Sequence, residues 1–541
     1  MVKIVPRNYK AIDFYSGIGG WTLGLKFAGI NVTDSYEWWD QANNTHLANL
    51  KNNTHQSDIR ELSISNLPNK VDIVVGSPPC TQFSYSNRGG SGDIEDGLKD
   101  IKKFLDIVKK IKPKFWAMEN VPRVEKVLQK EILPNGKLYK YRNIINASMI
   151  EVYDFSEFGL PQKRKRCIAG NFDHELLKSY KEKCKLKNLG TVINSFDKKT
   201  VKDCNFNISI SSNALTDNEK EEKLSKEELR FNKSSKTHHA VYNDMSFPDS
   251  FDKPVRTITA TCTRVSRESV IIKDEKKYRR LTVRERSSLQ GFPISYQFFG
   301  NSYSAKLKMI GNAIPPVFTY YLANSMIGTQ PENLVLLENI KHSFSFSKEN
   351  GNITTPETAG KSYPENRSFR FAIPNLRFKS GTRFELNNKN KNKGKIKWAI
   401  YFYFGDSKRI LELNLNLETQ KKVLNFLKSR DKNYLKQVNK IISNKYSNIN
   451  FINLQKIWTG REKGDHPFNL LDCLGKDALS LIKILEKIEK EFFDNFVRSN
   501  LTRIDKNTKK PIGITKLEKY SREITAGIIL GCVFNLSKEK L

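Results

Sequence analysis

The chain has 541 residues, of which 38% are apolar, and it carries a formal net charge of +34 at pH 7. Its length allows about two to four domains, and no apolar run approaches the length of a membrane span, so an integral membrane protein is not expected. The charge favours a polyanionic partner such as nucleic acid, although a lysine-rich solvated surface has the same composition. The part after residue 330 is the more densely basic one.

Strand-like and helix-like patterns alternate over residues 1–170. Strands are predicted at residues 11–14, 32–37, 71–76 and 115–118, and the first, third and fourth of these are short, largely apolar runs. Between the last two, residues 101–111 repeat apolar side chains at helical spacing. This alternation predicts an α/β fold in which a mostly parallel sheet carries helices on both faces.

Residues 171–278 interrupt this pattern. They are lysine-rich, with a polar stretch at 213–236, and they predict only short strands, such as one at 269–273. Regular structure is expected again at 282–289 and 317–327. We therefore expect an inserted recognition region at 171–278 and a return to the first region over 279–330.

A second unit is expected after a polar linker. Strands are predicted at 369–372, 395–404 and 410–414, and helices at 416–429, 476–498 and 514–530. These patterns predict a basic α+β accessory domain over residues 346–541.

The cysteines and histidines argue against a metal site. The chain has seven of each, with no CxxC pair and no ligand spacing among them. Neither a zinc site nor a disulfide framework is expected, and a reducing cytoplasm fits best. The first residues become polar too early for a signal peptide.

Cys80 follows two prolines where the predicted strand 71–76 ends. A thiol attacks as the thiolate, and with an ordinary pKa of about 8.5 it needs a positive or hydrogen-bonding environment. A lone cysteine is more often a small buried apolar residue. Its interpretation as a nucleophile depends on the other segments of the sheet.

A glycine-rich loop, residues 13–20, lies between the first strand and a helix. Glycines there allow a nucleoside cofactor to approach the backbone, and Glu37 follows at a spacing that suits a ribose diol. The pattern is not a full GxGxxG, so a tight turn explains it equally well. Asp58 and Ile59 offer a polar group and an apolar contact for an adenine edge.

Glu119 comes directly after the predicted strand 115–118, at an edge where side chains face the ligand crevice. Cys80 ends another strand of the same sheet, so a nucleophile and an acid can converge. Arg164 and Arg166 alternate in an extended segment and are expected to share a face, where guanidiniums suit phosphate or carbonyl oxygens. The ordinary alternatives are a helix cap for Glu119 and a solvated basic strand for the two arginines.

Together these segments resemble the C5-cytosine DNA methyltransferase family of the bacterial restriction–modification type. The resemblance covers roughly residues 8–328, and the ordered set is far more specific than any single motif. The matching pieces are Asp13–Gly20, Glu37, Asp58–Ile59, Pro79–Cys80, Glu119–Val121, Gln162–Arg166, Arg279–Glu285, Gly291–Pro293 and Gly311–Pro316. The chain departs from the family at Thr81, where Gln is usual, and Gln82 comes one residue later.

The resemblance implies a class I methyltransferase with a Rossmann-like sheet, S-adenosyl-L-methionine as cofactor and a flipped-out cytosine of duplex DNA as substrate. Cys80 would add to C6 of the base, and Glu119 would hydrogen-bond or protonate N3. Arg166 would hold the carbonyl side, and Arg164 would support the site. The implied cofactor-binding residues are Tyr15, Gly17, Gly20, Glu37, Trp38, Asp58, Ile59, Pro79 and Asn312.

The resemblance also implies where DNA binds. Residues 171–278 match the family's target-recognition domain and include Arg256 and Thr257. Residues 84–97 hold four glycines and Arg88, a composition that suits a mobile loop closing over DNA. DNA contacts are therefore expected at Ser84, Arg88, Arg256 and Thr257. The expected setting is the cytoplasm and nucleoid, without membrane association.

Three alternatives stay open. The transfer-RNA branch of the family has the same chemistry, but its Cys-Phe-Thr tripeptide is absent from this sequence. A nuclease or other effector in the tail would need acidic residues with a lysine, and Glu385 with 406–408 lacks a D…ExK spacing. A non-catalytic regulator would not need the intact set of Cys80, Glu119 and the two arginines. A cognate restriction endonuclease or defence-system partner is compatible with the resemblance, and the target sequence cannot be read.

Overall fold

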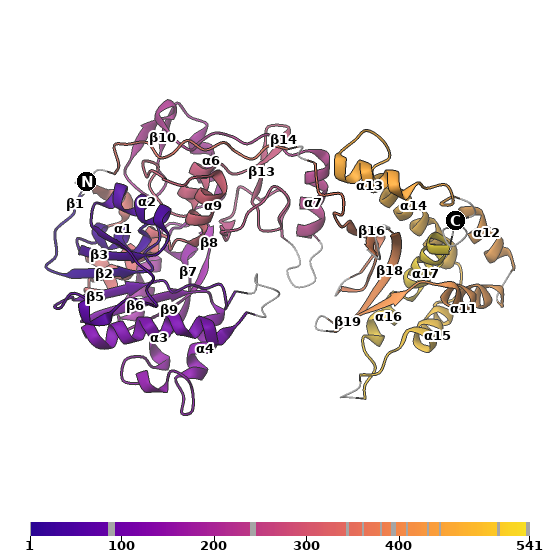
Figure 1. The fold of residues 1–541 in the computed structure, drawn as a ribbon, viewed down its shortest axis with the longest axis horizontal. Coiled ribbons are helices and arrows are strands. Elements are labelled where there is room, and N and C mark those ends of the chain that lie inside the picture. Colours follow the sequence, from indigo (N-terminus) through magenta and orange to yellow (C-terminus); the bar gives the residue numbers. More distant parts are fainter. Residues whose placement is uncertain are drawn as a thin grey trace. The chain divides into compact units, whose positions relative to one another are not determined.

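The computed structural model describes residues 2–84, 92–237, 245–341, 346–359, 362–378, 381–390, 397–406, 409–429, 432–442, 445–505 and 509–536. The chain divides into two compact units (Figure 1). The first holds the described residues up to 359 and the second those from 362 onward. Each unit has its own sheet.

A seven-stranded sheet forms the centre of the first unit, in the order β4–β3–β2–β5–β6–β9–β7. Its strands are β2 (Lys10–Phe14), β3 (Asn31–Glu37), β4 (Asn53–Gln56), β5 (Ile73–Gly76), β6 (Phe115–Asn120), β7 (Ile150–Asp154) and β9 (Lys165–Gly170). Neighbouring strands of this sheet pair in parallel, except that β9 pairs antiparallel with both β6 and β7. Only ten residues separate β7 from β9, too few for the usual parallel crossover. The predicted mostly parallel sheet is confirmed.

Helices cover both faces of this sheet, as predicted (Figure 1). Successive residues of β2 alternate between the faces, because Ala11 joins one apolar cluster and Ile12 the other. One face packs α1 (Gly20–Phe27), α2 (Asp40–Leu50) and α10 (Pro316–Met326), and the other packs α3 (Ile94–Ile111) and α4 (Arg123–Glu131). Helix α3 starts earlier than its apolar spacing predicted, because Asp93 caps it by accepting hydrogen bonds from the backbone of residues 95 and 96.

Two glycines of α1 allow α10 and the segment before it to approach closely. A Cβ at Gly20 would lie 2.0 Å from the carbonyl oxygen of Ile314, and one at Gly24 would lie 2.0 Å from Thr319 Oγ1. Any larger side chain would therefore push α1 away from α10. This close approach sets the segment before α10 beside the loop that opens α1.

The region at 171–278 contains helices as well as short strands, so the expectation of short strands alone was wrong. Its elements are α5 (His174–Ser179), α6 (Leu189–Phe196), β10 (Thr200–Lys202), β11 (Ser209–Ser211), α7 (Lys226–Thr237), β12 (Val255–Arg256) and β13 (Ile271–Asp274). Strand β12 pairs in parallel with β8 (Gln162–Lys163), just before β9. The remaining elements are β1 (Val2–Lys3), β14 (Lys277–Arg280), α8 (Val283–Leu289), α9 (Tyr303–Asn312) and β15 (Ile340–Lys341).

The second unit has an antiparallel sheet of β16 (Arg370–Arg377), β17 (Arg383–Asn390), β18 (Lys397–Asp406) and β19 (Arg409–Asn414). Its helices are α11 (Leu417–Lys428), α12 (Lys432–Ile442), α13 (Phe451–Gly460), α14 (Pro467–Leu485), α15 (Lys490–Leu501), α16 (Ile514–Lys519) and α17 (Ser521–Leu536). The helix predicted at 476–498 is in fact two, α14 and α15. Strand β17 and helices α12 and α13 were not predicted. No helix among the described residues is long and apolar enough to cross a membrane.

Candidate active site

Cys80 lies in a turn after β5 that is held from two sides. Asn120, the last residue of β6, donates from Nδ2 to the Pro78 carbonyl at 3.0 Å. Trp21 of α1 donates from Nε1 to Ser77 Oγ at 2.9 Å. Beyond Cys80, the backbone N–H groups of Phe83 and Ser84 both donate to its carbonyl at 3.0 Å. The cysteine is therefore fixed by the neighbouring strand, by α1 and by its own turn.

Glu119 and Arg166 form an ion pair beside this turn. The Arg166 Nε to Glu119 Oε1 distance is 2.9 Å, and their side chains are 13% and 9% exposed. Glu119 lies inside β6 rather than after it, a correction to the sequence reading. Strand β6 continues to Asn120 because β9 pairs with it there, and Glu119 faces Ile168 in the register.

Arg164 is buried between β8 and β9 and binds three carbonyl oxygens. It donates to Ile258 at 3.0 Å, Gly311 at 3.2 Å and Ala313 at 3.1 Å. These acceptors belong to the region at 171–278 and to the segment before α10. Arg164 therefore joins parts of the chain that are far apart in sequence, and its guanidinium is used within the protein.

The electrostatic setting of Cys80 combines opposing effects. The residue is exposed, but enough protein surrounds the thiol that desolvation raises its pKa. Arg166 and Arg164 lower this pKa, and Glu119 raises it. The structure therefore brings together all four side chains predicted for catalysis, with a thiol whose ionisation depends on its charged neighbours.

The loop before α1 faces Glu37 at the end of β3. Glu37 accepts from the backbone N–H of Gly17 at 2.8 Å and of Trp39 at 2.9 Å. Burial raises the pKa of Glu37, and these hydrogen bonds oppose that rise. Tyr15 and Gly17 both have φ of 53°, the left-handed region, so the loop turns sharply under the carboxylate.

Three observations test whether a nucleoside cofactor fits at this loop. A Cβ at Gly17 would meet no described atom within 4 Å, so the backbone is open to a ligand there. The buried Ser16 hydroxyl has no hydrogen-bond partner among the described residues. The Trp38 ring is 64% exposed directly after buried Glu37. An open backbone, a free hydroxyl and an exposed aromatic face suit a nucleoside, so the residues present fit the group.

The other predicted cofactor residues lie at the ends of neighbouring elements. Asp58 and Ile59 follow β4, and Asp58 Oδ1 accepts from the backbone of Arg60 at 2.9 Å. Pro79 is exposed next to Cys80, and Asn312 is exposed at the end of α9. The carboxyl ends of β4, β3, β5 and β6 thus carry Asp58, Glu37, Cys80 and Glu119 along one sheet edge, where ligands bind in such sheets.

The predicted DNA contacts are engaged within the protein or lie outside the described residues. Arg256 forms an ion pair with Asp249 at 2.6 Å, and Thr257 Oγ1 donates to the Lys163 carbonyl at 2.9 Å. Ser84 closes the Cys80 turn through its backbone. Arg88 falls in 85–91, outside the described residues. All four DNA contacts stay predictions.

Sequence reasoning missed the residues that hold the site rather than line it. Asn120 and Trp21 fix the Cys80 turn, and Arg60 connects Asp58–Ile59 to α3 through ion pairs with Asp96 and Asp100. No sequence spacing signals these contacts, because each joins segments brought together by the sheet. Within the described residues no group of His, Cys, Asp or Glu could hold a metal.

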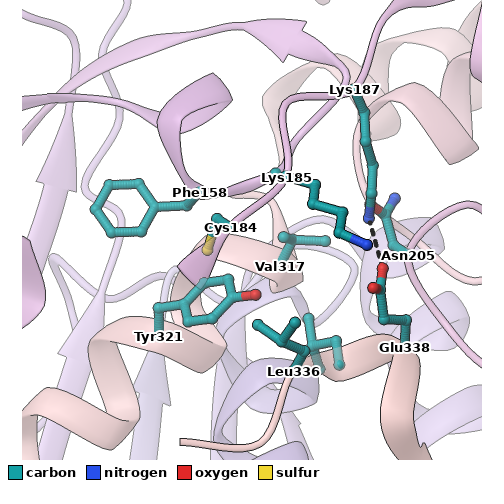
Figure 2. Close-up of a pocket in the computed structure, with 11 residues that line it drawn as sticks. Phe158, Cys184, Lys185, Lys187, Asn205, Val317, Tyr321, Leu336 and Glu338 are labelled. Carbon is teal, nitrogen blue, oxygen red and sulfur yellow. Dashed lines mark hydrogen bonds and ion pairs between the residues drawn. The ribbon is translucent and has the colours of Figure 1, made fainter. Parts of the chain in front are cut away.

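A separate pocket in the first unit contains none of the predicted site residues (Figure 2). Lys187 crosses it, with Nζ 3.1 Å from Asn205 Oδ1 and 3.5 Å from Glu338 Oε2. The other labelled residues are Phe158, Cys184, Lys185, Val317, Tyr321 and Leu336. Two of its charged groups, Lys187 and Glu338, pair with each other, and the pocket is not the candidate active site.

A family model described as C-5 cytosine-specific DNA methylase matches residues 9–328. The chain belongs to this family. It is a DNA (cytosine-5-)-methyltransferase, and the family's methyl donor is S-adenosyl-L-methionine. The match includes every residue predicted for catalysis and for cofactor binding, and it leaves the second unit outside.

Curated relatives of the DNA methylase are similar over the same region. The chain is 26% identical over 361 residues to the type II methyltransferase M.FnuDI of Fusobacterium nucleatum, covering 62% of this chain and 99% of that protein. It is 28% identical over 342 residues to M1.HphI of Haemophilus parahaemolyticus, covering 58% and 86%. The S. pombe Dnmt2 methyltransferase structure matches with a TM-score of 0.40 at 15% identity, covering 60% and 100%.

Proposed function

We propose that the enzyme methylates a flipped-out cytosine within a specific sequence of duplex DNA through a covalent bond between Cys80 Sγ and C6 of the base. The observation that carries this proposal is the convergence of Cys80, Glu119, Arg164 and Arg166 at one sheet edge. Cytosine C5 is too weak a nucleophile to take a methyl group unaided, so a thiolate addition at C6 is the chemistry that this set suits.

The residues act in a definite order in this mechanism. The Cys80 thiolate bonds to C6, and the electrons of the C5–C6 double bond become available at C5. Glu119 hydrogen-bonds or protonates N3, which stabilises the charge that develops on the ring. The bound cofactor supplies an electrophilic methyl group carried on sulfur. C5 would take up this methyl group as the carbon–sulfur bond to it breaks. Loss of the C5 proton to water then expels Cys80 as the thiolate, which breaks the Cys80–C6 bond and restores the ring double bond.

Arg166 and Arg164 have different roles in this proposal. Arg166 holds the Glu119 carboxylate at 2.9 Å and lies where it can meet the carbonyl side of the base. Arg164 has a supporting role, because its guanidinium donates hydrogen bonds to three backbone carbonyls. Both also lower the Cys80 pKa and so favour the thiolate.

The cofactor site proposed here is the loop and sheet edge around Glu37. Glu37 accepts from the ribose hydroxyls, Trp38 lies along the adenine, and Asp58 with Ile59 meets the adenine edge. Tyr15, Gly17, Gly20, Pro79 and Asn312 complete the pocket. The open position at Gly17 and the free Ser16 hydroxyl support this arrangement.

The finer architecture is also a proposal. The strand order with a reversed β9 next to the last strand supports a Rossmann-like class I methyltransferase domain. We assign 1–170 and 279–330 to catalysis, 171–278 to target recognition and 346–541 to a basic accessory domain that binds DNA. Base extrusion costs a few kcal/mol, which contacts from the recognition region must repay.

The relatives support a proposal for the biological setting of the enzyme. M.FnuDI and M1.HphI are described as type II methyltransferases. We propose that this enzyme likewise protects DNA in a restriction–modification or antiphage system, in the cytoplasm at the nucleoid, with a cognate endonuclease as partner. Among the described residues of the second unit, no observation favours a nuclease over DNA binding.

The test is expression in a bacterial host free of DNA methylation, followed by bisulfite sequencing. The parent enzyme and Cys473→Ala, which removes another exposed cysteine, should methylate one sequence, and Cys80→Ala should methylate none. Methylation by Cys80→Ala would overturn the mechanism. A parent enzyme that modifies only transfer RNA, or no nucleic acid, would overturn the proposed substrate. Magnesium-dependent cleavage of unmethylated DNA would instead assign a nuclease to the second unit.

A further inference from the structure

Arg60 connects the cofactor side of the site to the helix that follows Cys80. It comes directly after Asp58 and Ile59 in the chain. Its Nε and Nη2 donate to the two carboxylate oxygens of Asp100 at 3.0 and 2.6 Å, and its Nη1 donates to Asp96 Oδ1 at 3.0 Å. Both aspartates lie near the start of α3. One guanidinium therefore clamps two successive turns of this helix to the loop after β4.

The same two aspartates extend the connection in opposite directions. On the cofactor side, Tyr15 Oη donates to Asp100 Oδ1 at 3.4 Å. On the nucleophile side, Gln82 Nε2 donates to Asp96 Oδ2 at 3.4 Å, and Gln82 Oε1 accepts from the Asp93 backbone at 3.0 Å. We call this set of Tyr15, Asp100, Arg60, Asp96 and Gln82 the Arg60 bridge.

The bridge ends in the turn that presents the thiol. Gln82 is two residues after Cys80, and the next two residues donate their backbone N–H groups to the Cys80 carbonyl. A shift of Gln82 therefore moves the turn that holds Cys80. The family usually has Gln directly after the cysteine, whereas here Gln82 comes one residue later. From this position Gln82 reaches the start of α3, which gives a physical reason for the shift.

Charge neutralisation alone does not explain Arg60. Asp96 lies in the first turn of α3, where the helix dipole already stabilises a carboxylate. Asp100 is 3% exposed, so it needs a partner, but the side chain that pairs with it is also placed to reach Asp96. A planar guanidinium can donate to two carboxylates in fixed directions, which a lysine ammonium cannot do.

We infer that Arg60 is a positioning residue that couples occupancy of the cofactor site to the placement of Cys80. This inference rests on the proposed sites for the cofactor and the nucleophile. Arg60 acts through Asp100 and Tyr15 on one side and through Asp96 and Gln82 on the other. This coupling is reciprocal. If bound cofactor favours one placement of Gln82 by a given factor, fixing Gln82 in that placement raises cofactor affinity by the same factor.

A double-mutant cycle measured by calorimetric binding of S-adenosyl-L-homocysteine to the full chain tests the coupling. Gln82→Met removes the far end of the bridge, and we expect it to weaken binding at least about threefold in the parent. In an Arg60→Met background the same change should have less than about 1.5-fold effect. Arg60→Lys, which keeps the charge, should behave like Arg60→Met.

Lys103→Met is the matched control. Lys103 of α3 also ties that helix to the loop after β4, donating to the Leu62 carbonyl at 2.7 Å, but it does not contact Asp96 or Asp100. The effect of Gln82→Met should be unchanged in this background. Additive effects of Arg60 and Gln82, or equal coupling through Lys103, would overturn the inference. The readout is binding alone, so a failure to methylate DNA would count against the proposed function and not against the coupling.

Discussion

The ionisation of Cys80, the proposed nucleophile, depends on its charged neighbours. Desolvation raises its pKa and the Glu119 carboxylate raises it further, while Arg166 and Arg164 lower it. The net shift is upward, so at neutral pH the thiol is mostly protonated in the protein without ligands. A substrate that shares a proton with Glu119 removes the nearby negative charge and so favours the thiolate. Activation is thereby linked to the arrival of the base.

Replacing Arg166 tests this electrostatic account. In Arg166→Met the lost positive charge should raise the Cys80 pKa further, which moves the pH midpoint of alkylation upward. At pH 8, iodoacetamide should then modify Cys80 about three- to tenfold more slowly, because one pKa unit is a tenfold change in thiolate. The rate is followed by mass spectrometry of the Cys80 peptide. Lys165→Met, at the exposed preceding residue, should leave the rate unchanged, and faster alkylation in Arg166→Met would contradict the account.

At the scale of elements, the sheet edge organises the site and Arg164 joins its distant parts. The strands β5 and β6 place Cys80 and Glu119, and β9 supplies Arg166. Arg164 binds the carbonyls of residues 258, 311 and 313, so one buried guanidinium joins the region at 171–278 to the segment before α10.

Loss of Arg164 should therefore destabilise the first unit. In Arg164→Met three carbonyl oxygens lose the Arg164 donor, and among the described residues only that of Ala313 keeps a side-chain hydrogen bond, from Gln290 Nε2. Each of the other two then costs about 1–3 kcal/mol as an unpaired buried polar group. We expect a loss of about 3 kcal/mol or more, seen as a lower urea midpoint for the first unit, with slower methyl transfer. The exposed Lys163→Met is the control. An unchanged midpoint would show that Arg164 does not hold these segments together.

The sequence allowed prediction of the elements whose apolar pattern is strong. Strands β2, β5 and β6 are short, largely apolar runs, whereas β3 was predicted although only Val32 and Tyr36 in it are apolar. The convergence of Cys80 and Glu119 follows from parallel strand ends. The polar edge strand β4 and the polar β17 carry no such pattern and were missed. The extension of β6 over Glu119 depends on pairing with β9. The Arg60 bridge depends on side chains from four segments. These are long-range contacts, and no local spacing encodes them.

For the whole molecule, the charge of +34 extends beyond the family region. The family match ends at residue 328, and the part after residue 330 is the more densely basic. A DNA methyltransferase needs phosphate contacts to find its site, and an accessory basic unit adds to them. The second unit therefore fits a role in holding DNA rather than in the chemistry.

Salt dependence tests this use of charge. Binding of the full chain to duplex DNA without a target site should weaken at least about 10³-fold between 50 and 200 mM salt, as expected for six or more phosphate contacts. The plot of log affinity against log salt should have a slope of about −5 or steeper, measured by fluorescence anisotropy. A slope shallower than about −2 would mean that most lysines are only a solvated surface.

The covalent bond between Cys80 and the base is the central claim, and trapping it is the most direct measurement. A fluorine at C5 cannot leave as the proton does, so DNA with 5-fluorocytosine at the mapped site should stay bonded to the enzyme after methyl transfer. Peptide mass spectrometry should find the adduct on Cys80 in the parent and in Cys473→Ala, and no adduct in Cys80→Ala. An adduct on another residue, or normal methylation with no adduct, would contradict the account.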